Sequence, residues 1–200
     1  MKKKKILVIK GGTSKEREIS LKTGKACISA IKKIGYKVVA FDPKFSSIFE
    51  IEKIKPDIVF NALHGKNGED GKIQSFFEYL RVPYTHSGVI SSMLAMNKNL
   101  SKNIFIENNI RIPNFFYIDE KNYSKTNLAN RIKINKLNFP IVVKPNDEGS
   151  SIGVKICKNL KILKGEFDSL KKKYKGLIFE TFIPGKEIQV ALMGDRALGA

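Results

Sequence analysis

A single lysine ends an apolar run and stands directly before a loop of small residues. The run is Phe139-Pro140-Ile141-Val142-Val143-Lys144-Pro145, and Asn146-Asp147-Glu148-Gly149-Ser150-Ser151-Ile152-Gly153 follows it. A strand of this kind can fix an ammonium group beside phosphates, and glycines and serines let backbone N–H groups close over them. We therefore predict a nucleoside triphosphate site on Lys144 and on the loop residues Glu148, Gly149, Ser150 and Ser151. The alternative is a polar surface turn, and the position of the loop directly after the lysine strand argues against it.

The run 177–187 predicts a second strand followed by a hinge. Its carboxylates, Glu180 and Glu187, flank the apolar residues Phe182 and Ile183. Such a pattern suits a site that holds a purine between apolar side chains and binds its ribose. The two runs, in this order, resemble the ATP-grasp fold.

Two glycines separate a predicted strand from a predicted helix near the start of the chain, in the segment Gly11-Gly12-Thr13-Ser14-Lys15-Glu16. One interpretation is a capping box, with Thr13 at the N-cap and Glu16 at the third helical position. Spacing alone favours this interpretation over a functional one. In the functional interpretation, Glu16 is an exposed carboxylate at the ligand edge of a sheet, suited to bind a small ammonium group.

His64 follows the strongest predicted strand and precedes a glycine-rich loop with the acidic pair Glu69 and Asp70. A buried structural histidine and a functional one are about equally favoured here. The acidic pair is alternatively a cap for the next helix. Lys98 begins another predicted helix, where an exposed surface lysine is the default interpretation. His86 carries no partner signal, and we assign no role to it.

These residues follow strands that alternate with helices in the first half of the chain. Strands are predicted at 5–10, 37–42, 57–63 and 82–85, and helices after Gly12 and at 72–81. The first helix carries Ile19, Ala26, Cys27, Ala30, Ile31 and Ile34 on one face, and the second carries Phe76, Phe77 and Leu80. This alternation predicts a parallel sheet, with the loops after its strands gathered along one ligand-binding edge.

The pattern changes at about residue 97. Further predictions are helices at 98–109 and 127–137, strands at 115–118, 141–144, 153–157 and 177–183 with a lysine-rich helix between the last two, and a hairpin of 187–193 and 196–200. We therefore expect an α/β fold in three parts. Residues 1–96 form a Rossmann-like, parallel-sheet, substrate-binding domain, 97–184 a small α+β ATP-grasp subdomain, and 185–200 the start of a truncated C-terminal ATP-grasp domain.

The formal net charge of +18 raises the question of a nucleic-acid partner. Almost all of the basic residues are lysines, whereas base readers and phosphate clamps depend on arginine forks. We therefore predict a lysine-coated surface and no specific nucleic-acid partner. The apolar run 6–9 is shorter than the roughly seven residues of a secretory signal, and no stretch reaches transmembrane length. Cys27 and Cys157 lack disulfide or metal-site spacing, so we expect a cytoplasmic protein with reduced thiols and no membrane partner.

In their order along the chain, these motifs closely resemble those of the D-alanine–D-alanine ligases of bacterial cell-wall synthesis. The matching segments are Gly11-Gly12-Thr13-Ser14-x-Glu16-Arg17-Glu18-x-Ser20, Leu63-His64-Gly65-x-x-Gly68-Glu69-Asp70-Gly71, Pro83-Tyr84-Thr85-x-Ser87-Gly88, Met96-Asn97-Lys98 and Val143-Lys144-Pro145-x-x-Glu148-Gly149-Ser150-Ser151-x-Gly153. They span nearly all of the chain, and the first two separate this family from most other ATP-grasp enzymes. His86 and Asn97 depart from the family's pattern, and neither is a named ligand.

The resemblance implies ATP-dependent joining of two D-alanine molecules through an acyl phosphate, for peptidoglycan precursor synthesis, cell-wall biogenesis and cell shape. It implies that Glu16 anchors the ammonium group of the first D-alanine, that Ser150 orients its carboxylate and that His64 lies near the acyl end. The residues implied for ATP are Lys98 and Lys144 for the triphosphate, the covering loop 148–153, Glu180 with the backbone of Phe182 and Ile183 for adenine, and Glu187 for the ribose. Phosphoryl transfer depends on such positioning and charge neutralisation.

The family continues beyond this chain, with a mobile loop, an arginine and the ligands of two magnesium ions. We find no metal ligands here and expect the Mg²⁺ (or Mn²⁺) site of full-length members to be absent from this chain. The 200-residue chain alone is accordingly expected to be inactive, and a full-length member to be an active homodimer. Residues that choose the second substrate lie partly in the further portion. Ligation of D-alanine to D-lactate or D-serine therefore stays open, as does a non-catalytic nucleotide- or polyanion-binding remnant.

Overall fold

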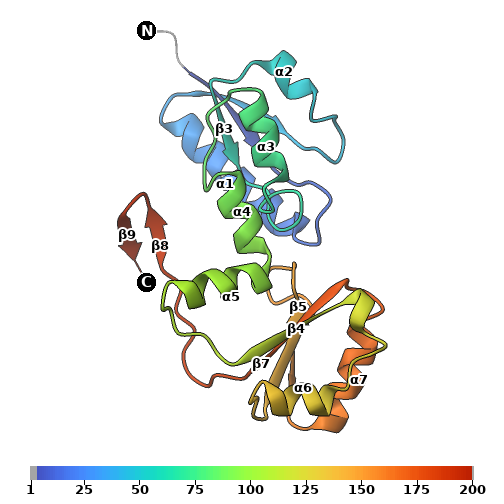
Figure 1. The fold of residues 1–200 in the computed structure, drawn as a ribbon. Coiled ribbons are helices and arrows are strands. Elements are labelled where there is room, and N and C mark those ends of the chain that lie inside the picture. The colour runs from blue at the N-terminus through green and yellow to red at the C-terminus, as the bar shows by residue number, and fades with distance from the viewer. Residues whose placement is uncertain (1–3, 200) are drawn as a thin grey trace.

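The computed structural model describes residues 4–199 and contains three sheets that follow one another along the chain (Figure 1). Residues 1–3, and Ala200 at the end of the predicted hairpin, lie outside the described residues. The first sheet is parallel in the order β2-β1-β3, with bounds β1 Lys5–Ile9, β2 Lys37–Phe41 and β3 Ile58–Asn61. The parallel sheet and the mixed α/β fold class are therefore as predicted.

Helix α1 (Arg17–Lys33) packs on this sheet through small side chains. Its buried residues are Ser20, Gly24 and Ile31. A Cβ atom on Gly24 would stand 2.5 Å from the Cβ of Lys10, so only glycine allows this close approach. The predicted apolar face is only partly correct. Cys27 and Ile31 belong to a core cluster with the sheet. Ala26 and Ala30 are exposed, and Ile19 and Ile34 are 49% and 71% exposed.

Three shorter helices complete the first part of the chain, α2 (Glu50–Ile54), α3 (Lys72–Tyr79) and α4 (Val89–Met96). The predicted strand 82–85 instead contributes a parallel bridge between Tyr84 and Val59 of β3, and no ladder in the described residues. Helix α4 was not predicted, because it follows Gly88 without a capping side chain and lacks a polar face.

The second sheet is antiparallel in the order β4-β7-β5-β6. Its strands are β4 Phe115–Asp119, β5 Ile141–Pro145, β6 Lys155–Cys157 and β7 Gly176–Thr181, and the helices of this part are α5 Lys98–Glu107, the 3-10 turn η1 Glu120–Asn122, α6 Leu128–Ile134 and α7 Leu160–Leu170. Phe116 and Phe179 stack at 4.7 Å between ring centroids in the core that α6 and α7 share. Helices α4 and α5 lie between the two sheets (Figure 1).

The chain ends in the predicted hairpin, formed by β8 (Ala191–Met193) and β9 (Arg196–Gly199). Its side chains are exposed in this structure. No helix within residues 4–199 has the length and apolar character that crossing a bilayer requires.

Asp42 follows β2 and holds the glycine turn that leads into α1. The Arg17 guanidinium lies 2.8 Å from the Asp42 carboxylate, and the backbone N–H of Gly12 donates to it at 3.0 Å. Partial burial by itself raises the pKa of Asp42. Hydrogen bonds from Arg17 and from the backbone of Lys44 and Gly12 outweigh burial and lower that pKa to about 2. The folded state therefore stabilises the ionised form of Asp42.

Asp42→Asn is expected to lower the free energy of unfolding by about 1–2 kcal/mol at neutral pH and by little near pH 2. The folded-state pKa lies below the ordinary value of 3.8, so the stabilisation is present above about pH 4 and is lost as the pH falls toward 2. Urea unfolding across this range measures the difference, with the exposed Asp195→Asn as control. A difference that did not change with pH would contradict the ionic origin of the contact.

Candidate functional site

A cleft of about 470 Å³ lies where the loop after β5 meets α4 and the start of α5. Its lining consists of Glu69, Ala95, Met96, Lys98, Lys144, Pro145, Glu148, Gly149, Ser150, Ser151, Ile152 and Val154. The structure therefore brings together the two lysines and the loop residues that the sequence predicts for a triphosphate.

Strand β5 places Lys144 on the face of the second sheet that points away from α6 and α7. Ile141 and Val143 belong to the core beneath those helices, and successive residues of a strand point to opposite faces. Glu180 on β7 is in register with Val142, which makes it a diagonal neighbour of Lys144 on the same face. Nζ of Lys144 donates to Oε1 of Glu180 at 2.5 Å.

The second oxygen of Glu180 lies 2.8 Å from Nζ of Lys102, a residue of α5 that sequence analysis did not identify. The contact is an ion pair without hydrogen-bond alignment, since Oε2 accepts no aligned hydrogen bond from the described residues. Glu180 is 8% exposed. Burial alone raises its pKa, but Lys102 and Lys144 outweigh burial and the net pKa is lowered. The carboxylate therefore stays ionised between two ammonium groups.

Lys98 begins α5 and is half-buried beside the loop. Its Nζ donates to the backbone carbonyl of Glu148, and its own N–H donates to the carbonyl of Asn146 at 3.0 Å. Burial lowers the pKa of Lys98, and the positive charge of Lys144 lowers it further, whereas nearby carboxylates oppose the change. The default interpretation of an exposed surface lysine is therefore wrong for Lys98.

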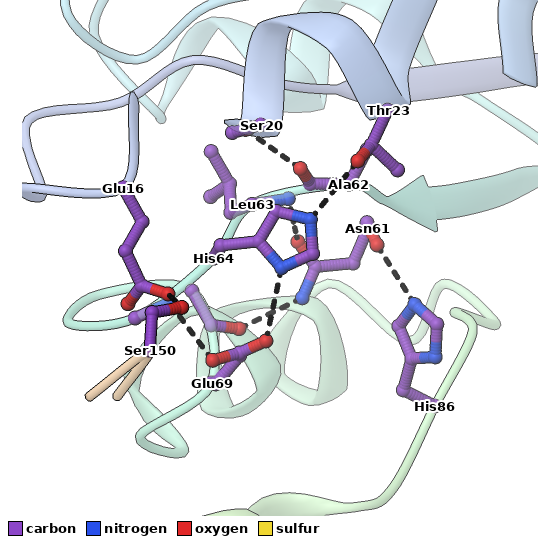
Figure 2. A network of polar contacts seen from close by, with 12 residues as sticks. Glu16, Ser20, Thr23, Asn61, Ala62, Leu63, His64, Glu69, His86 and Ser150 are labelled. Carbon is purple, nitrogen blue, oxygen red and sulfur yellow. Dashed lines mark hydrogen bonds and ion pairs between the residues drawn. The ribbon is translucent and has the colours of Figure 1, made fainter. Parts of the chain in front are cut away.

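The Glu16 side chain contacts the loop after β5 instead of capping α1. It precedes the helix, but no side chain caps that helix, so the capping box with Thr13 is wrong. Its carboxylate accepts a hydrogen bond from Oγ of Ser150 (Figure 2). Glu16 is 7% exposed, and the expectation of an exposed carboxylate is also wrong, because the loop after β5 covers it. Gly65 leaves room for this carboxylate, since a Cβ there would stand 2.2 Å from Oε2 of Glu16.

His64 is held through both ring nitrogens (Figure 2). Nδ1 lies 3.2 Å from Oε1 of Glu69, and Nε2 lies 3.1 Å from Oγ1 of Thr23. A carboxylate only accepts, so Nδ1 donates, and the Thr23 hydroxyl donates to Nε2 in the neutral ring. The ring is thus fixed at the end of β3, at the start of the glycine loop whose Gly65 lies against Glu16.

The acidic pair after His64 has two different tasks. Glu69 accepts from the backbone N–H of Gly65 at 2.8 Å and so shapes the glycine loop. Asp70 alone accepts from the first residue of α3, Lys72, at 3.4 Å. The N-cap residue of α3 is Gly71, which supplies no side-chain cap, so the predicted capping is reduced to this long contact of Asp70 and does not involve Glu69.

Two lysines fasten the loop after β5 to the first part of the chain. Lys15 lies 2.8 Å from a carboxylate oxygen of Glu148, and Lys66 lies 3.0 Å from one of Asp147. The Lys15 ammonium also stands 4.8 Å from the centre of the Tyr174 ring. Together with the Ser150–Glu16 hydrogen bond, these contacts hold the loop over the cleft.

Of the residues predicted for adenine and ribose, Glu180 lies on β7 and the others follow that strand, and none of them belongs to the lining of this cleft. The backbone N–H of Phe182 donates to the carbonyl of Pro140 at 2.9 Å. Ile183 is 64% exposed, and Glu187 is exposed as well. The roles of these residues stay predictions.

The donors of the cleft suit phosphate oxygens, because they are ammonium groups, hydroxyls and a glycine-containing loop. A protein-bound metal ion does not fit the described residues in the same way. Between residues 4 and 199, no three histidine, cysteine, aspartate or glutamate side chains gather as they would around a metal ion.

Two sequence models match the chain, that of the D-ala D-ala ligase N-terminus over residues 42–87 and that of the D-ala D-ala ligase C-terminus over residues 104–200. The chain belongs to the D-alanine–D-alanine ligase family. It is 49% identical to a D-alanine–D-alanine ligase of Pelagibacter ubique over 197 residues, which cover 98% of this chain and 64% of that relative. The predicted resemblance is confirmed.

Solved structures of D-alanine ligases share this fold. A D-alanine–D-alanine ligase of Bacillus anthracis, complexed with ATP, matches with a TM-score of 0.78 and 34% identity over 91% of this chain and 60% of that one. VanG, a D-Ala:D-Ser ligase of Enterococcus faecalis, matches with a TM-score of 0.77 and 25% identity over 92% of this chain and 64% of that one. The chain thus spans less than two thirds of the length of these relatives.

The sequence analysis missed four residues of this candidate site, namely Lys15, Thr23, Lys66 and Lys102. Lys102 stands four residues after Lys98, which places both on one face of a helix, and this spacing could have indicated it. Nothing in the sequence distinguishes Lys15 or Lys66 among 37 basic residues. Their acidic partners are known only once the chain is folded.

Proposed function

We propose that this chain supplies the D-alanine-binding part and the triphosphate-binding loop of a D-alanine–D-alanine ligase. The observation that carries the proposal is the hydrogen bond from Ser150 to Glu16, which joins two family motifs 134 residues apart. It brings a buried carboxylate, suited to an ammonium group, beside the ammonium groups suited to phosphates. That arrangement fits an amino acid whose own carboxylate is to be phosphorylated.

Residues in the cleft and beside it have positioning tasks in this proposal. When bound, ATP supplies the phosphoryl group that activates the carboxylate of the first D-alanine as an acyl phosphate. Glu16 holds the ammonium group of that D-alanine, and Ser150 orients its carboxylate toward the cleft. Lys98 and Lys144 neutralise phosphate charge, and His64 stands near the acyl end. The amine of a second D-alanine then attacks the activated carboxyl group, so that the peptide bond forms, the bond to phosphate breaks and phosphate and a proton leave.

The proposal also covers the parts of the reaction that lie away from the cleft. Glu180, Phe182 and Ile183 would contact adenine, and Glu187 the ribose. The product would serve peptidoglycan synthesis and cell shape, with Mg²⁺ held mainly by residues outside this chain. We place the reaction in the cytoplasm, in keeping with the free thiols of Cys27 and Cys157, and a homodimer stays a prediction.

Ligation of D-alanine to D-serine is the second candidate function. The similarity to VanG, a D-Ala:D-Ser ligase, supports it at 25% identity. The similarity to the Pelagibacter ubique ligase is 49%, so we favour D-alanine as the second substrate. No observation here favours D-lactate.

The test uses a fused ligase, in which these 200 residues are joined to the part of the Pelagibacter ubique relative that the match does not cover. We expect D-alanyl-D-alanine, ADP and phosphate to form when ATP and D-alanine are both present, and none of them with either alone. Competition with D-serine and D-lactate identifies the second substrate. Release of AMP would contradict the acyl-phosphate route, because AMP comes from an acyl adenylate.

A further inference from the structure

We propose that Lys102 is a positioning residue, which frees Lys144 for the phosphates of the nucleotide by holding the Glu180 carboxylate. The inference rests on the proposed nucleotide site. It adds Lys102, which lies outside the five segments that resemble the ligase family. It follows from the burial of three side chains, from their charges and from which of them faces the cleft.

Lys102 has no direct path to a bound phosphate. It is 8% exposed, its ammonium lies 4.9 Å from the centre of the Phe115 ring, and it contacts Oε2 of Glu180 whereas Lys144 contacts Oε1. Lys144 lines the cleft, whereas Lys102 is not part of its lining. Any effect of Lys102 on the nucleotide therefore passes through Glu180.

Glu180 binds Lys144 closely, and this contact competes with a phosphate. One carboxylate and one ammonium group form a neutral pair, and such a pair attracts a triphosphate weakly. If Lys144 turned toward the phosphate without another partner for Glu180, a buried carboxylate would be left without a countercharge, which is strongly unfavourable. In a chain that lacked Lys102, Lys144 would therefore stay with Glu180.

Lys102 removes this conflict because it gives the carboxylate a second partner. Glu180 keeps the ion pair at 2.8 Å through Oε2 while Oε1 releases Lys144. Two ammonium groups and one carboxylate also leave one net positive charge, and Lys144 is the member that can present it to the cleft.

A purely structural role for Lys102, as a tie between α5 and β7, makes a different prediction. Loss of a tie would weaken binding of every nucleotide equally. Loss of the positioning role would weaken binding in proportion to phosphate charge. The ratio of the affinities for ATP and for adenosine separates the two roles, since both ligands carry the same base and ribose.

The experiment measures ATP and adenosine binding to the 200-residue chain by titration calorimetry. We expect Lys102→Met to lower the affinity for ATP about tenfold and that for adenosine less than about twofold. Lys102→Arg should retain most of the affinity for ATP. Lys133→Met on the exposed side of α6 is the matched control, because it removes the same charge. The carboxyl pKa of Glu180, followed by NMR, should rise in Lys102→Met.

A double variant keeps the test decisive if Lys102→Met folds poorly. Lys102→Met with Glu180→Gln removes both charges and releases Lys144, so the ATP-to-adenosine ratio should return to about the wild-type value. A ratio that stays low would mean that Lys102 acts on the phosphates directly, and an equal loss for both ligands would mean a structural role. Either result would overturn the inference about Lys102 and leave the proposed nucleotide site standing. An absence of ATP binding by the wild-type chain would contradict the proposed nucleotide site as well.

Discussion

Lys144→Ala is expected to reduce kcat/KM of the fused ligase about 1000-fold or more. The substitution removes an ammonium group from the cleft that the loop after β5 lines, and the Lys144 side chain is only 21% exposed, so water replaces the lost charge poorly. It does not leave a buried carboxylate unpaired, because Lys102 still lies 2.8 Å from Glu180. The loss should therefore appear in catalysis and ATP affinity, with a small change in unfolding midpoint.

The control for Lys144→Ala is a lysine of the same sheet. Lys155 stands on β6, in register with Val143, and is exposed outside the cleft lining. Lys155→Ala should leave turnover within about twofold of the wild type. Steady-state assays of ADP release and thermal unfolding of both variants provide the comparison. Near-wild-type turnover of Lys144→Ala would show that Lys144 is a structural lysine.

The phosphate side of the site could be predicted because its signals are local. The residue types of the apolar run before Lys144 favour a strand, and the glycines and serines after it favour a loop. Strand alternation then fixes the face on which Lys144 lies. The same local logic placed the strands of the parallel sheet and the hairpin at the end of the chain.

The surroundings of Glu16 could not be predicted, because they depend on contacts between distant segments. Spacing around Glu16 favoured a helix cap, and the tertiary hydrogen bond to Ser150 overrides it. The apolar face of α1 was misjudged in part for the same reason, since the helix meets the sheet through Ser20 and Gly24 as well as through the predicted Ile31. Lys102 gave a weak signal because its ion-pair partner, Glu180, lies on a strand far along the chain.

Glu16→Gln is expected to raise the KM for the first D-alanine about 100-fold or more, with little change in the affinity for ATP. Glutamine has nearly the same shape and still offers an oxygen to the Ser150 hydroxyl, so the loop contact is retained. What is lost is the negative charge, which matters because Glu16 is 7% exposed and water cannot replace it.

The matched control is Glu18→Gln, which removes the same charge two residues later on the exposed side of α1. It should leave the KM for D-alanine unchanged within about twofold. Both variants are assayed in the fused ligase, with D-alanine and ATP varied separately and thermal unfolding recorded. If Glu16→Gln instead lowered kcat and the affinity for ATP together, with the KM for D-alanine unchanged, Glu16 would organise the loop. The ammonium site would then have to be sought at another carboxylate, of which Glu69 and Glu148 belong to the cleft lining.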